Sequence, residues 1–138
     1  MPFQVKWYVE GRVATVYNWG ELTVDEVRAT NQELLALVRS GTAPVHLVVD
    51  TLDVTRLPSS FVPMLKEIEI FRHEPNMGWS IMVTNSSVLH FFGMLSSNLN
   101  RTSYRALRNY REVNDLLKKV DPTLVDLLPE SWETRPTP

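Results

Sequence analysis

The sequence predicts an α/β fold in which a mixed, mostly parallel sheet is packed against helices. The chain opens with two neighbouring segments rich in Val, Tyr and Trp, which are typical of an antiparallel β-hairpin. Later apolar runs such as residues 45–50 are continuous rather than alternating, as expected of parallel strands buried on both faces. Amphipathic segments separate these runs, so we predict a sandwich with the element order β-β-α-β-α-β-α-β-α.

The first two strands are predicted over residues 3–10 and 12–20, with a tight turn at Glu10 and Gly11 between them. A helix follows: Thr23 and Glu26 have the spacing of a capping box, and Gly41 stands at the expected C-cap. Alternating strands and helices are predicted over residues 45–50, 59–78, 79–85, 86–99, 102–110 and 109–121, followed by a short turn of helix after Pro122.

The size of the chain suits a single domain. Its 138 residues are 43% hydrophobic, enough to bury a complete core. We expect residues 1–128 to form this domain and residues 129–138, PESWETRPTP, to form a poorly ordered tail.

Charge and composition restrict the classes of function. The 14 Lys and Arg residues nearly balance the 16 Asp and Glu residues, so we expect no nucleic-acid partner. No stretch resembles a signal peptide or a membrane span, which predicts a cytoplasmic protein without membrane insertion. The absence of cysteine excludes thiolate sites, and the three histidines lie in different elements, so we expect no metal and no cofactor.

The stretch DTLDVTRLPSSFVP, residues 50–63, resembles the central turn of the STAS domain, the fold of anti-sigma-factor antagonists. In that family an apolar strand ends in Asp, a short loop carries a Val and an Ile or Leu, and Asp-Ser-Ser-Gly begins the next helix. The sequence LVVD supplies the strand, Val54 and Leu57 match the loop, and Ser59 and Ser60 are in register. Pro58 and Phe61 stand where the family has Asp and Gly.

The resemblance implies a function as well as a fold. In phospho-regulated members of the family, the second serine of the motif is the phosphoacceptor. This serine corresponds to Ser60. It implies a bacterial, non-enzymatic signalling domain that acts by protein–protein interaction, and we place the interaction rim at Asp50, Asp53, Thr55, Ser59 and Ser60.

Helix geometry gives Ser60 a second interpretation. With Ser60 as N-cap, Pro63 falls at the third helical position, where its missing N–H needs no intrahelical acceptor. Ser60 is then a plain cap that accepts a hydrogen bond from the N–H of Val62. Cap and phosphoacceptor require the same position, so the sequence leaves both open.

Two further groups of residues could carry function. Arg101, Arg105 and Arg108 could form an anion patch or simply keep an edge strand soluble. A hydrophobic groove for a lipid or other small apolar ligand could include Trp79, Phe91, Phe92 and Met94, which is the alternative function: a carrier or sensor. The same apolar surplus could instead pack in the core or in a homodimer.

Overall fold

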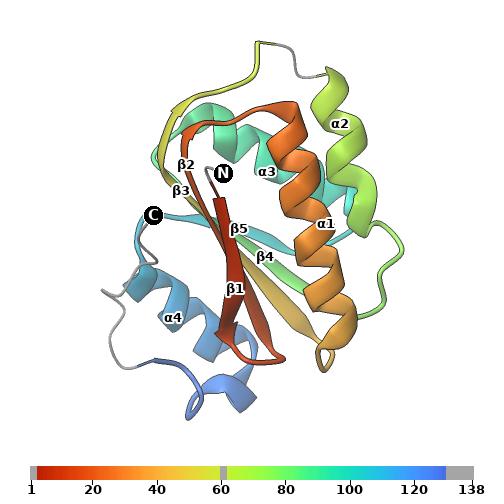
Figure 1. Ribbon diagram of the computed structural model, residues 1–138. Helices are drawn as coiled ribbons and strands as arrows, with labels where there is room; N and C mark the ends of the chain where they lie inside the picture. Colours follow the sequence, from red (N-terminus) through yellow and green to blue (C-terminus); the bar gives the residue numbers. More distant parts are fainter. Residues whose placement is uncertain (1–2, 60–61, 130–138) are drawn as a thin grey trace.

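A computed structural model gives the fold, and it describes residues 3–59 and 62–129. Figure 1 shows the strands gathered in one twisted sheet with helices on both of its sides. The predicted tail lies outside the described residues except for Pro129. Ser60 and Phe61, in the middle of the predicted serine turn, also lie outside them.

The described strands form one five-stranded sheet in the order β1-β2-β3-β4-β5. The β1–β2 pair is antiparallel, and every later pair is parallel. The mixed, mostly parallel sheet that opens with a hairpin is therefore confirmed. The strands are β1 (Phe3–Val9), β2 (Val13–Glu21), β3 (Val45–Arg56), β4 (Met77–Val83) and β5 (Tyr104–Leu107).

The strand order decides where the helices lie. Each parallel strand is added on the same side of the previous one, so right-handed crossovers place all the connecting helices on one face of the sheet. The last helix follows the edge strand β5 and covers the opposite face (Figure 1). The helices are α1 (Val24–Ser40), α2 (Val62–Ile68), α3 (Ser87–Asn100) and α4 (Tyr110–Val120), with short 3-10 turns η1 (Glu69–Phe71) and η2 (Pro122–Leu124).

Two hydrophobic clusters occupy the two faces of the sheet. On the α4 face, Val113 and Leu117 of the helix and Leu124 of η2 pack on Val48 and Ile81 of the strands. On the opposite face, Leu34 and Val38 of α1 pack on Val16 and Leu47. Successive residues of β2 and β3 alternate between the clusters, as the strand period requires.

Side chains begin the helices as the sequence predicts. Thr23 caps α1 by accepting a hydrogen bond from the N–H of Glu26 at 3.2 Å. Asn109 caps α4 by accepting from the N–H of Glu112 at 2.9 Å. Gly41 caps the C-terminus of α1 in an extended conformation, and Gly11 makes the hairpin turn with φ of +74°.

Two predicted boundaries or faces differ from the structure. Strand β3 does not end at Asp50 but continues to Arg56, because β2 also extends and Trp19 to Glu21 provide pairing partners. The apolar pattern of residues 86–99 predicts a buried stripe of Val88, Phe91, Phe92, Leu95 and Leu99 on α3, but Val88 and Phe91 are exposed. The buried residues of α3 are Leu89, Phe92, Gly93, Ser97 and Asn100.

Candidate functional site

The candidate site lies at the carboxyl ends of β2 and β3. These strands run in parallel to a common end, where Gly20 pairs with Val54 and the N–H of Leu22 donates to the carbonyl of Arg56 at 2.8 Å. An open groove of about 470 Å³ lies beside this end. We call it the strand-end groove, and its described lining is Glu21, Leu22, Thr23, Val24, Arg56, Leu57, Pro58, Ser59 and Pro63.

The strand-end groove joins two segments that are distant in the chain. One wall is the connection from β2 to α1, and the other is the connection from β3 to α2. Its lining is mixed: Glu21 and Arg56 are exposed and oppositely charged, while Leu22 is buried at the base. Such a surface can accept a chain of mixed polarity, as protein interfaces do.

Asp50 is not part of an exposed rim. Its side chain is completely buried on the α4 face, where the hydroxyl of Tyr110 donates to it at 2.9 Å. The backbone N–H of Leu52 donates to its other oxygen at 3.1 Å. Because β3 continues past this position, Asp50 lies inside the sheet and cannot touch a partner directly.

The other described members of the predicted interaction rim are exposed. Asp53, Thr55 and Ser59 all face solvent, and Ser59 also lines the strand-end groove. The hydroxyl of Tyr17 donates to the carboxylate of Asp53, which fixes that side chain near Trp19. Helix α2 begins at Val62, with Pro63 in its first turn. Ser60 lies outside the described residues, so its assignment as the N-cap stays a prediction.

The three arginines of the predicted anion patch are exposed but belong to different elements. Arg101 ends α3 in a left-handed conformation with φ of 57°, and Arg105 lies within β5. Arg108 follows β5, and its backbone N–H donates to Glu112 at 2.9 Å. A shared anion site therefore remains a prediction.

The four residues of the predicted hydrophobic groove do not converge. Trp79 packs against the cluster on the α4 face, whereas Phe92 lies on the opposite side of the sheet. Phe91 and Met94 are 60% and 43% exposed. The reason is that adjacent phenylalanines on a helix point about 100° apart, so only Phe92 can reach the sheet.

A cavity that the sequence analysis did not predict lies between the sheet and α1, α2 and α3. Its volume is about 120 Å³. Phe92 contributes to it from α3, Leu34 from α1, Met64 from α2 and Val49 from β3. The sequence did not indicate the polar residues of this cavity. In the hydrophobic pattern of a helix, a buried serine or asparagine cannot be distinguished from an exposed one.

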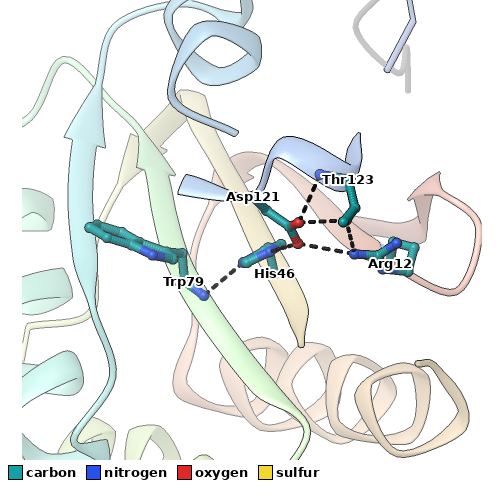
Figure 2. Close-up of polar contacts among 5 residues, drawn as sticks. All are labelled: Arg12, His46, Trp79, Asp121 and Thr123. Carbon is teal, nitrogen blue, oxygen red and sulfur yellow. Dashed lines mark hydrogen bonds and ion pairs between the residues drawn. The ribbon is translucent and has the colours of Figure 1, made fainter. Parts of the chain in front are cut away.

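The second unpredicted feature is a buried node of polar side chains at the amino ends of the parallel strands (Figure 2). His46 and Asp121 are 75 positions apart and meet at 2.9 Å between Nε2 and Oδ2. Arg12 donates to the same carboxylate oxygen at 3.0 Å and to the hydroxyl of Thr123 at 2.7 Å. The node joins the turn between β1 and β2, strand β3 and the turn that follows α4.

Its hydrogen bonds determine the proton positions on His46. The backbone N–H of Trp79 donates to Nδ1 at 2.9 Å, so that nitrogen carries no proton. Nε2 therefore carries the proton and donates it to Asp121. Both ring nitrogens are occupied within the core, so His46 is placed to join segments rather than to exchange protons with a substrate.

Asp121 is ionised in this environment. Burial alone would raise the pKa of its carboxyl group, but hydrogen bonds from Thr123 and His46 and the charge of Arg12 outweigh it and hold the pKa below its usual value. The buried node thus contains one carboxylate balanced by one guanidinium.

The described residues give two further results. They hold no group of three or more His, Cys, Asp or Glu side chains placed to bind a metal ion. No described helix is long and apolar enough to cross a membrane.

Comparison with known proteins supports the fold. No protein-family model matches the sequence, and no curated protein matches it. The structure is similar to that of an uncharacterized protein of the DUF3478 family from Shewanella loihica PV-4, which has a SpoIIAA-like fold. The TM-score is 0.59 at 12% sequence identity, and the match covers 83% of this chain and 93% of that chain.

The chain therefore has a SpoIIAA-like fold, which is the fold of STAS domains and anti-sigma antagonists. At 12% identity the likeness shows the fold alone.

Proposed function

We propose that this chain is a non-enzymatic regulatory domain that binds a protein partner in a bacterial signalling pathway in the cytoplasm. Its binding surface is the strand-end groove together with exposed Asp53, Thr55 and Ser59. The observation that carries the proposal is this groove, because it lies at the carboxyl ends of parallel strands, where α/β sheets present their sites.

The composition of the groove supports interaction rather than catalysis. Ser59 is its described serine, and no histidine accompanies it among the described lining residues. A serine nucleophile requires an adjacent base, usually His, within hydrogen-bond reach.

Phosphorylation of Ser60 is the regulatory part of the proposal, and it rests on the resemblance to STAS domains. A phosphoserine at position 60 adds up to about two negative charges to the residue that follows Ser59, which lines the strand-end groove. Because Glu21 already lies in that groove, the modification would make the surface more acidic and weaken binding to an acidic partner.

A binding assay tests the protein-interaction function. Anti-sigma-type serine kinases encoded in the same genome are purified and titrated against the protein by calorimetry. Thr55→Trp should abolish binding because it blocks the surface beside the groove, whereas Lys118→Trp, on the exposed side of α4, should leave binding unchanged. Equal loss in both variants, or no binding to any such kinase, contradicts the proposal.

The phosphorylation step has its own test. The same kinases are incubated with the parent protein and with Ser60→Ala, and the intact mass is measured. Addition of one phosphate to the parent alone supports the assignment, and equal labelling of both proteins discards it.

A second candidate function is a carrier or sensor of a hydrophobic ligand, and the unpredicted cavity favours it. Its volume of about 120 Å³ is well below the roughly 300 to 1,000 Å³ of pockets that hold drug-sized molecules. A whole lipid therefore does not fit in this conformation. Native mass spectrometry would detect a retained small hydrophobic ligand, and it would report a homodimer in the same spectrum.

A further inference from the structure

We propose that the cavity between the sheet and α1, α2 and α3 is a binding site for a small, uncharged, mainly apolar molecule that carries one hydrogen-bonding group. Phenol has the size and chemistry of this class. The cavity shares Leu22 with the strand-end groove, but its other described lining residues differ, so the proposal does not depend on the proposed protein partner.

The walls of the cavity are mostly apolar. Strands β2 and β3 contribute Val16, Leu47 and Val49, while Leu34 and Phe92 face them from α1 and α3. Apolar walls favour an apolar ligand, because water in such a space makes few hydrogen bonds.

The wall contains a buried hydroxyl that has no partner among the described residues. Thr30 of α1 is only 5% exposed, and its hydroxyl finds no hydrogen-bond partner among the described residues. Neighbouring polar groups are used: the hydroxyl of Thr51 donates to the carbonyl of Val83 at 3.0 Å, and the side-chain amide of Asn31 donates to the carbonyl of Glu67 at 2.8 Å.

An unpaired buried hydroxyl is costly, by about 1 to 3 kcal/mol. Thr30 lines the cavity, so a ligand inside it can supply the missing partner. Asn18, 4% exposed on β2, also lines the cavity and offers both a donor and an acceptor.

Charge and size define the ligand class. None of the described lining residues is charged, so an ionic ligand would lose its hydration without compensation. The volume of about 120 Å³ is close to that of an engineered protein cavity, about 150 Å³, that accepts benzene. Nucleotides and lipids are too large.

The test uses three probes of similar shape: phenol, toluene and benzoate. Each is titrated into isotope-labelled protein at millimolar concentration, and the amide signals are followed by NMR. We expect phenol and toluene to shift signals of cavity residues, and benzoate to shift none of them. Failure of phenol and toluene to bind the folded protein, or binding of benzoate at the cavity, overturns the proposal.

A matched pair of variants tests the role of the hydroxyl. Thr30→Val keeps the shape of the side chain and should weaken phenol binding by about two- to tenfold while leaving toluene binding unchanged. Thr15→Val is the control, because Thr15 is also buried but is not among the described residues that line the cavity. Should Thr30→Val leave the phenol-to-toluene affinity ratio unchanged, the hydroxyl is not the binding group and the assignment is wrong.

Discussion

The two faces of the sheet are closed in different ways. The face covered by three helices, α1, α2 and α3, encloses a cavity and a buried hydroxyl without a described partner. The face covered by α4 alone is joined by hydrogen bonds between distant segments, among them Tyr8 to Asn114 and His46 to Asp121. The two faces therefore differ in what lies inside them: a cavity on one face and a buried polar node on the other.

This difference follows from the topology. Helices α1, α2 and α3 are each held at both ends by strands, so their positions are fixed by the connections. Helix α4 is held by a strand only at its start, and specific side-chain contacts must fix its far end. Asp121, directly after α4, supplies such a contact.

Removing the Asp121 carboxylate should have the largest effect. Asp121→Asn leaves Arg12 without its ion pair in a largely buried site, and we expect a loss of about 3 kcal/mol in the free energy of unfolding by urea. Asp115→Asn, on the exposed side of α4, should change it by less than about 0.5 kcal/mol. Equal effects would mean that the node does not hold this face.

The same residue predicts a pH dependence. The pKa of Asp121 is lowered in the folded protein, so its stabilisation is present above the unfolded value of about 3.9 and is lost as the pH falls through the folded value. The parent protein should therefore lose stability below about pH 4 more steeply than Asp121→Asn. Parallel pH profiles of the two proteins would contradict this assignment.

Gly78→Ala should disturb the same node from the next strand. A methyl group at position 78 would lie 2.6 Å from Nδ1 of His46, which must then move away from the N–H of Trp79. We expect a cost of about 2 kcal/mol, measured by urea unfolding, and a changed NMR signal of the His46 ring proton. An unchanged ring signal would show that the imidazole is not held as described.

Tyr110→Phe should cost slightly less, about 1.5 kcal/mol, because it removes a hydrogen bond to the buried carboxylate of Asp50. Tyr8→Phe is the matched change at a partly buried hydrogen bond, since the Tyr8 hydroxyl donates to the side chain of Asn114, and about 1 kcal/mol is expected. Thermal unfolding of both variants measures the two losses. A larger loss in Tyr8→Phe than in Tyr110→Phe would contradict this ranking.

The smallest expected change in the free energy of unfolding comes from replacing one threonine of β2 or one threonine of α1. The Thr15 hydroxyl donates to the carbonyl of Val48 at 3.0 Å, so Thr15→Val should cost about 1 kcal/mol. The Thr30 hydroxyl has no described partner, so Thr30→Val should be neutral or stabilising in the ligand-free protein. A comparable loss in both variants, measured by urea unfolding, would remove the proposed contrast between the faces.

Sequence patterns predicted the fold well because hydrophobic period and helix caps are local. The caps at Thr23 and Asn109 needed only four residues each, and the continuous run at residues 45–50 was enough to indicate a buried strand. The end of β3 was missed because it depends on pairing with Trp19 to Glu21, which a local pattern does not contain.

The candidate sites depended more on tertiary contacts and were predicted less completely. Ser59 was correctly placed beside the start of a helix, but the burial of Asp50 depends on Tyr110, 60 positions later. His46 and Asp121 gave no signal because nothing in the spacing of a His and an Asp so far apart indicates a contact. The burial of Ser97 and Asn100 on α3 was not predicted, because the hydrophobic pattern of this helix is set mainly by its phenylalanines.

The strand order also has a consequence for how the chain assembles during synthesis. Each strand pairs with a strand that has already left the ribosome, so the sheet can grow from the hairpin onward without waiting for a distant segment. The contact of Arg12 with Asp121 does have to wait for a distant segment, because the two residues are 109 positions apart. We therefore expect the sheet to form progressively during synthesis and the domain to complete its folding only after Asp121 has left the ribosome.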